Sequence, residues 1–544
     1  MYSIEIVLTM LLAVVASGYL ARALPIAVPM PLMQIAMGAL IAGVFNHGVT
    51  LDPEIFFLLF LPPLLFLDGW RIPKDGLLRD KNVILQMALG LVVFTVVGAG
   101  FLIHWLIPAM PLAVAFALAA IVSPTDPVAV SAITARVPIP RRLMHILEGE
   151  SLLNDASGLV CFRFAVAAAM TGSFSLASAS LTFVWVAFAG LGIGAGFTLG
   201  VSLAQGWLSR RLGEEAGSPI LLSVLIPFGA YLLAEAVQAS GILAAVAAGI
   251  TMSYVELSGR ALAITRVRRA AVWDTMQFAL NGIMFVLLGE QLPAILRGAA
   301  ASVEQSGHRG AWWLAAYALA ISLGLALLRF AWVWTSLQAS VAIARRRGHA
   351  STKPHWRLVV ATSLAGVRGA ITMAGVMTLP LFLPGGEPFP ARELTIFLAT
   401  AVILLSLVLA SVGLPRLLQG LELPPEPTLR LEEDRARREA SSAGIAAIDK
   451  ARHELPHAPA DAEIYANAAA RAIALYRNRL GGTDASDVDA AELRKAEQVE
   501  RTLRLAGLRA ERAKIFEMAR HSQISDETSR KLVREIDLIE ARYR

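Results

Sequence analysis

The chain has 544 residues, of which 56% are hydrophobic and only 17% are charged, and its formal net charge is +6. Its mean hydropathy of +0.61 excludes an ordinary soluble domain. The positive charge lies mostly in arginines between apolar runs, so it indicates membrane topology and not nucleic-acid binding. The single cysteine, Cys161, excludes an intramolecular disulfide and a cysteine-based metal cluster.

Apolar runs of about 20 residues, long enough to cross a bilayer as helices, recur from the first residues to about Leu418. The first run contains Glu5 and lacks a basic segment before it, so we expect a retained helix and not a signal peptide. About thirteen transmembrane helices are predicted, near 3–21, 25–45, 53–70, 83–105, 110–134, 143–170, 180–206, 218–237, 240–257, 275–295, 311–340, 357–383 and 393–418. The composition changes past Gly420, which predicts a membrane domain over 1–419 and a helical tail over 420–544.

Basic residues are concentrated in every second loop between these helices. The basic loops contain Arg71 to Lys81, Arg136 to Arg142, Arg210 and Arg211, Arg266 to Arg269, and Arg345 to Arg347. The intervening loops are nearly free of Lys and Arg, except the one with Arg297 and Arg309. Because cytoplasmic loops are enriched in Lys and Arg, the pattern predicts a multi-pass protein of the cell (inner) membrane. The N-terminus would lie outside and the tail in the cytoplasm.

An odd helix count allows an architecture of two inverted six-helix repeats, helices 1–6 and 8–13, joined by helix 7. The fifth helix of each repeat is interrupted, by SPTDP at 123–127 and by GVRG at 366–369. Broken helices at matching positions in two halves indicate a transport site. Asp126 before Pro127 can also cap a second half-helix, and Arg368 can stabilise negative helix ends.

The helix predicted over 143–170 contains an unusual number of polar residues, namely Glu148, Glu150, Ser151, Asn154, Asp155 and Arg163. A charge at the bilayer centre costs roughly 2.5–3.5 kcal/mol, so each acid there needs a role. Ser151 and Asp155 share one face of the helix, and so do Glu150 and Asn154. The alternative for either acid is a structural ion pair between helices, and this alternative is stronger for Glu150 than for Asp155.

Six stretches together carry a family resemblance: FFLLFLPPLLFLDGW at 56–70, SPTDPVAV at 123–130, EGESLLND at 148–155, SGILAAVAAGI at 240–250, LNGIMFVLLG at 280–289 and GVRGAITMA at 366–374. They resemble, in order, the monovalent cation:proton antiporters of the sodium/proton exchanger type, the cation:proton antiporter-1 family. The end of the tail, HSQISDETSRKLVREIDLIEARYR, resembles that of bacterial members. The resemblance also implies a homodimer and a part in pH homeostasis.

The resemblance assigns roles to residues of the two motifs around the first break. It implies that Asp155 is the ion-binding carboxylate, with Asn154 before it. Thr125 and Asp126 of the broken helix and Ser151 would complete the ion site, with Na⁺ held by Asp155, Thr125 and Ser151.

Charged residues elsewhere in the membrane receive other roles. The resemblance implies a structural ion pair between Glu150 and Arg368. Asp68 lies near a position where some relatives have another acid. Arg163 and Arg329 have no assigned function, and structural ion pairing is the expected role of both.

Asp155 is expected to carry the transported ion. Burial disfavours a carboxylate anion, so the site is neutral when it holds either a proton or a cation, and oxygen ligands suit Na⁺. The empty anion is costly to move through a hydrophobic barrier, which enforces exchange of Na⁺, and with it Li⁺, for H⁺ by alternating access. No ATP and no cofactor are needed. An Asn at 154, where a second Asp would add charge, matches electroneutral relatives by resemblance.

The sequence allows three alternatives to Na⁺/H⁺ exchange, of which two are disfavoured. A K⁺/H⁺ antiporter of the same fold stays open, because oxygen ligands alone do not fix the ion preference. A cation channel is disfavoured because the sequence has no repeated filter-like loop. An enzyme is disfavoured because the sequence lacks a credible nucleophile–base pair, and Pro456 interrupts the one H-E-x-x-H match at 453–457.

Overall fold

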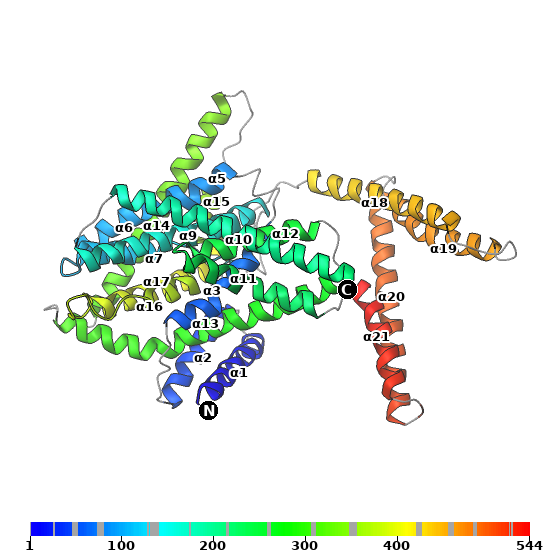
Figure 1. Cartoon of the computed structure of the whole chain (residues 1–544), viewed down its shortest axis with the longest axis horizontal. Helices are drawn as coiled ribbons and strands as arrows, with labels where there is room; N and C mark the ends of the chain where they lie inside the picture. The colour runs from blue at the N-terminus through cyan, green and yellow to red at the C-terminus, as the bar shows by residue number, and fades with distance from the viewer. Residues whose placement is uncertain are drawn as a thin grey trace. The chain divides into compact units, whose positions relative to one another are not determined.

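The computed structural model describes residues 2–24, 28–45, 53–72, 81–127, 130, 141–172, 176–213, 217–257, 263–305, 312–346, 356–419, 427–454, 462–481, 487–521, 523 and 526–543. Within these ranges the regular elements are helices, with one isolated bridge between Phe382 and Pro388 (Figure 1). The chain divides into two compact units, Met1–Leu421 and Glu422–Arg544. The identification of the first unit as a membrane domain and the second as a cytoplasmic tail stays a prediction.

The described residues of the first unit form sixteen helical segments: α1 (Tyr2–Ala23), α2 (Met30–Phe45), α3 (Pro53–Arg71), α5 (Lys81–Leu85), the π-helix η1 (Gln86–Leu91), α6 (Val92–Leu106), α7 (Leu112–Ile121), α9 (Arg141–Thr171), α10 (Leu176–Leu212), α11 (Ser218–Ala236), α12 (Gly241–Leu257), α13 (Ala263–Gln305), α14 (Trp312–Arg346), α15 (Trp356–Leu364), α16 (Ala370–Met377) and α17 (Arg392–Leu418). Among the described residues, eight helices are long and apolar enough to cross a membrane, and three more are apolar but shorter. The predicted count of about thirteen and the inverted repeats stay predictions.

Both predicted interruptions are present. Helix α7 ends at Ile121, and residues 122–126 are not helical. Pro124 and Pro127 lack the backbone donors that a continuous helix would need. Helix α15 ends at Leu364, and the chain is extended or turning until α16 begins at Ala370. Both breaks lie inside apolar segments, so their backbone polar groups need partners from the protein.

The helices of the first unit pack as two groups. The α13 group consists of α1, α2, α3, α10, α11, α12 and α13, and the α9 group of α5, η1, α6, α7, α9, α14, α15, α16 and α17. Contacts within each group are dense, and the main contact between them is α13 on α17. Small residues allow the closest approaches, because a methyl group on Gly249 of α12 would overlap the carbonyl of Phe66 in α3.

In the second unit, the residues that the structure describes form four helices, α18 (Pro427–Glu454), α19 (Ala462–Gly481), α20 (Asp487–Arg520) and α21 (Asp526–Tyr543). Helix α18 packs on α19, and α20 packs on α21 (Figure 1). Arg512 joins the second pair of helices by ion pairs with Glu540 and, at 2.6 Å, with Asp537.

Candidate ion site

The two interrupted helices meet at their breaks. The backbone N–H of Asp126 donates to the carbonyl of Val367 over 2.7 Å, which joins one break to the other. The side chain of Asp126 lies directly against Gly369, where any Cβ would overlap the carboxyl group. Because the backbone at Gly369 is extended, the glycine is required for space and not for its conformation.

Arg368 supplies the positive charge at the end of the first half-helix. Its Nη1 donates to the carbonyl of Ser123 and, over 2.9 Å, to that of Pro124. The residue is only 4% exposed, and its backbone N–H donates to Ser406 Oγ at 3.0 Å. The carbonyls that follow α7 have no helical partner, so a buried guanidinium there satisfies both the hydrogen bonds and the negative helix end.

Glu150 is paired with Arg329 of α14. Two hydrogen bonds join the groups, 2.5 Å from Nη1 to Oε1 and 2.9 Å from Nη2 to Oε2. Both side chains are at most 3% exposed, and Arg329 Nε also donates to Thr362 O at the end of α15, at 3.2 Å. The structure thus corrects the expected pairing of Glu150 with Arg368. Sequence spacing could not show whether Arg329 or Arg368 faces Glu150. In the structure the guanidinium of Arg368 donates to backbone carbonyls instead.

Helix α9 holds the first break through Thr125. Ser151 Oγ donates to the carbonyl of Thr125 at 2.8 Å, and Asn154 Nδ2 donates to its hydroxyl at 3.0 Å. The hydroxyl of Thr125 in turn donates to Glu150 Oε1 at 3.4 Å. Gly158, one turn further along α9, lets that helix pack directly on Pro124. The polar face of α9 therefore fixes the unwound segment in place.

Asp155 has a different environment from Glu150. It is 4% exposed and lines a small cavity of about 30 Å³. In the part of the chain that the structure describes, no side chain forms an ion pair or a hydrogen bond with its carboxyl group. A cavity needs roughly 10–15 Å³ to hold a water molecule, so this one can hold about two, or a partly dehydrated monovalent cation.

Asp68 of α3 and Asp126 line the same small cavity as Asp155. The remaining lining residues are Leu64, Pro124, Thr125, Pro127, Ser151, Gln277, Asn281, Gly369, Ile371 and Thr372. Of the residues that the sequence assigned to the ion site, Asp155, Asp126, Thr125 and Ser151 are brought together here. Asn154 is not among the described lining residues, and its contact is to Thr125. No three His, Cys, Asp or Glu side chains in the described ranges lie closely enough to hold a metal ion.

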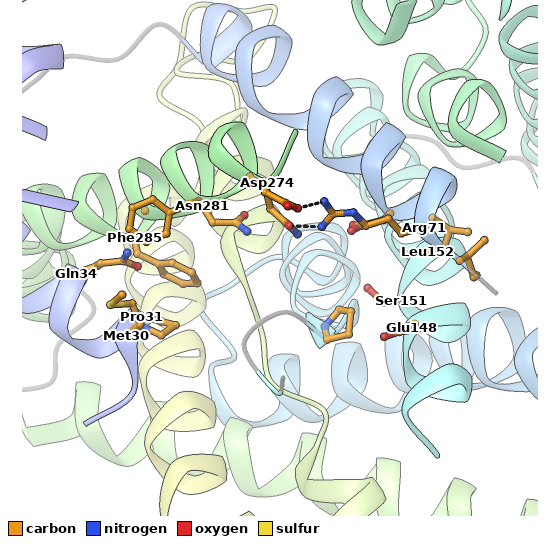
Figure 2. A pocket seen from close by; sticks show the side chains of 16 residues that line it. Met30, Pro31, Gln34, Arg71, Glu148, Ser151, Leu152, Asp274, Asn281 and Phe285 are labelled. Carbon is orange, nitrogen blue, oxygen red and sulfur yellow. Dashed lines mark hydrogen bonds and ion pairs between the residues drawn. The ribbon is translucent and has the colours of Figure 1, made fainter. Parts of the chain in front are cut away.

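A wide cavity of about 620 Å³ adjoins the small one. The two share Asp68, Pro127, Ser151, Gln277 and Asn281 in their walls. Figure 2 shows the wide cavity between α13 and α3, with Arg71 and Asp274 facing each other and Glu148 and Ser151 on α9. The side chains of Arg71 and Asp274 are 40% and 66% exposed, so they mark its mouth.

Three polar residues of α13 escaped the sequence analysis, although they line these cavities. Asp274, Gln277 and Asn281 are spaced at helical intervals, so they share one face of α13. That spacing, together with the presence of Asn281 in the family-like stretch at 280–289, could have indicated from the sequence that these residues line a cavity. Of the residues that the sequence left without a function, Arg329 lies in the ion pair with Glu150, and Arg163 lies 3.2 Å from Glu235 of α11.

An all-helical unit with two broken apolar helices that cross at a buried carboxylate defines a polytopic membrane transporter. The profile of the family described as "sodium/hydrogen exchanger, transmembrane" matches residues 7–420. The chain therefore belongs to the sodium/hydrogen exchanger family.

Curated relatives agree with this assignment, and a solved structure has a similar fold. The "uncharacterized Na(+)/H(+) exchanger YjcE" of Escherichia coli K12 is 42% identical over 542 residues, covering 98% of each chain. A "sodium, potassium, lithium and rubidium/H(+) antiporter" of Bacillus subtilis is 38% identical and covers 99% of this chain and 78% of its own. The fold is similar to that of the sodium proton antiporter MjNhaP1 from Methanocaldococcus jannaschii, with a TM-score of 0.58, 17% identity, and coverage of 77% of this chain and 99% of that chain.

Proposed function

We propose that the chain exchanges Na⁺, with Li⁺ as a second substrate, for H⁺ across the cell membrane. The observation that carries this proposal is the contrast between two buried acids on one helix. Glu150 is neutralised by Arg329, whereas Asp155 lines a cavity of about 30 Å³ and has no ion-pair partner among the described residues. Glu150 maintains the structure, and Asp155 is the group that binds and releases the transported cation and the proton.

Asp155 provides the coupling between the two ions. A proton or a cation neutralises its carboxylate, and either loaded form can lie in the low-dielectric interior. The empty anion cannot do so without a large desolvation penalty, so transit of the unloaded site is suppressed. Thr125 and Ser151 line the cavity beside Asp155, and both carry hydroxyl oxygens, which are hard ligands of the kind that Na⁺ prefers. The exchange needs no cofactor beyond the transported ions.

Alternating access is part of the proposal, and the division into two helix groups supports it. Asp126 and Asp155 belong to the α9 group, whereas Asp68, Gln277 and Asn281 belong to the α13 group, and the small cavity lies between them. The wide cavity reaches this site from the side of Arg71 and Asp274. Movement of the α9 group against the α13 group would close this path and open one on the opposite side.

Electroneutral exchange, one cation for one proton, is part of the proposal. It is supported by the pairing of Glu150 with Arg329, which leaves Asp155 as the acid of α9 that faces the small cavity. Clamping the membrane potential in liposomes tests it, because the rate of an electroneutral exchanger does not depend on that potential. A homodimer, a role in pH homeostasis, an external N-terminus and a cytoplasmic tail complete the proposal.

K⁺/H⁺ exchange at the same site is the second candidate. The Bacillus subtilis relative is named for sodium, potassium, lithium and rubidium and matches 99% of this chain. The small cavity is lined by oxygen-bearing side chains, and such ligands do not by themselves exclude a larger cation. Ion preference is therefore a property to be measured in the same assay as exchange.

The test is proton flux in proteoliposomes with Na⁺, Li⁺ and K⁺ added in turn. Wild-type protein should move protons in response to Na⁺, and Asp155→Asn should lose this response while eluting and melting as a folded protein. Asp537→Asn, an exposed substitution in the tail, is the matched control and should retain flux. Wild-type flux from folded Asp155→Asn would overturn the assignment of Asp155, and Asp126 would become the next candidate.

A further inference from the structure

Arg71 is an unexpected residue at the mouth of the wide cavity. Of the described residues that line this cavity, Asp68, Glu148 and Asp274 are acidic, and Arg71 is the one with a permanent positive charge. A path that admits cations gains from acidic walls, because they raise the local cation concentration. A guanidinium at its mouth has the opposite effect.

Two residues of α13 hold Arg71 in place. Its Nη2 forms an ion pair with Asp274 Oδ1 (Figure 2), and its Nη1 donates to Gln277 Oε1 at 2.7 Å. A guanidinium can only donate, so Gln277 must turn its amide oxygen toward Arg71. Gln277 also lines the small cavity at Asp155, so this network extends from the mouth to the ion site.

We propose that Asp274 sets the cation affinity on this face of the protein by neutralising Arg71. This inference rests on the proposed cation exchange. With Asp274 in place, the mouth is neutral and the acids deeper in the cavity attract the cation. Without it, the charge of Arg71 opposes each entering cation. For a cation on the order of 10 Å from the guanidinium of Arg71, the Coulomb repulsion lowers cation affinity about twofold in water. At the effective dielectric constant of a protein surface it lowers cation affinity about fifteenfold.

A purely structural role is the competing explanation. Arg71 and Asp274 lie on α3 and α13, which belong to one helix group, and both side chains are partly exposed. Exposed ion pairs contribute little to stability, which weakens the structural explanation. The two explanations differ in sign. Neutralising Arg71 and neutralising Asp274 have opposite effects on an entering cation, whereas both equally remove a structural contact.

The experiment measures KM and maximal rate for Na⁺ added to one face at a time, in vesicles of defined orientation. Asp274→Asn should raise KM between about twofold and about fifteenfold on the face of the wide cavity, without changing the maximal rate. Arg71→Gln should lower KM, and the double variant should return close to wild type. Added choline chloride should shrink both shifts, because salt screens exposed charges.

Glu393→Gln is the matched control, since it removes the acid of another ion pair that does not line the cavity. Its KM should equal that of wild type. Shifts of KM in the same direction for Arg71→Gln and Asp274→Asn, or equal shifts on both faces, would overturn the inference. Should Asp274→Asn not fold, a raised KM in Arg71→Gln alone would overturn it. Failure of the proposed exchange itself would appear separately, as a wild-type protein no more active than Asp155→Asn.

Discussion

Arg163 of α9 and Glu235 of α11 form an ion pair, with 3.2 Å between Nη2 and Oε1, that joins the two helix groups. The pairs Arg71–Asp274 and Glu150–Arg329 each lie within one group. Glu235 also accepts the backbone N–H of Gly241 at 3.4 Å, so the acid is fixed at the start of α12. An ion pair that joins two groups must break or stretch when they move.

Breaking this pair should therefore change the rate of exchange more than the affinity. The side chains are 52% and 34% exposed, and such pairs contribute about 0.2–1 kcal/mol, which corresponds to at most about fivefold in an equilibrium between two states. We expect Arg163→Gln to change the maximal Na⁺-dependent proton flux within that range, with KM unchanged. Glu235→Gln keeps an acceptor for Gly241 and should have the same effect. A shift of KM at constant maximal rate would contradict this prediction.

The pair of Glu150 and Arg329 should instead determine stability. Glu150→Gln leaves the guanidinium of Arg329 buried without its counter-charge, and breaking a buried pair from one side costs about 3–5 kcal/mol. The double variant Glu150→Gln, Arg329→Met removes both charges and should recover part of the loss. Denaturation of the purified protein in detergent measures this coupling.

A double-mutant cycle of Glu150 with Arg368 distinguishes the observed pairing of Glu150 with Arg329 from the pairing with Arg368 that the resemblance implied. The guanidinium of Arg368 donates to Ser123 and Pro124, so Arg368→Met should destabilise the break chiefly through the loss of these two bonds. The coupling between Arg368→Met and Glu150→Gln should therefore be smaller than the coupling between Glu150→Gln and Arg329→Met. A coupling as large as that between Glu150 and Arg329 would show that Arg368 is the true partner.

The sequence was sufficient to predict the two breaks and the importance of α9. Proline pairs and the GVRG segment cannot continue an apolar helix, and acids in such a helix need partners or a function. It could not assign the partner of Glu150, because Arg329 and Arg368 are both intramembrane arginines and only the three-dimensional position of Arg329, whose side chain reaches Glu150, decides between them. It also missed Asp274 and Gln277, because polar residues on a long helix often face water.

Gly369 should tolerate no side chain. A Cβ there would overlap the carboxyl group of Asp126, which lines the small cavity, so the crossing of the two breaks would have to open. We expect Gly369→Ala to abolish exchange or to reduce it at least about tenfold, as misplaced site residues commonly do. Gly192→Ala in α10 is the matched control, because nothing lies within 4 Å of its added methyl group. Proteoliposome flux at equal amounts of folded protein compares the two, and normal flux from Gly369→Ala would contradict the described crossing.

Asn154 should act through Thr125 and not as a direct ligand of the cation. Its Nδ2 donates to the hydroxyl of Thr125 at 3.0 Å, and it is not among the described residues that line the small cavity. Removing a buried hydrogen bond costs about 1–3 kcal/mol, so Asn154→Leu should loosen the break and weaken Na⁺ binding. Because the same bond is already lost in Thr125→Val, adding Asn154→Leu to that variant should raise the KM for Na⁺ little further.

Ser157→Ala on the same helix serves as the control. The hydroxyl of Ser157 donates to Ala88 O of η1 at 2.8 Å, and its removal should leave the KM for Na⁺ unchanged. Additive increases in KM from Asn154→Leu and Thr125→Val would show that Asn154 contacts the cation by itself.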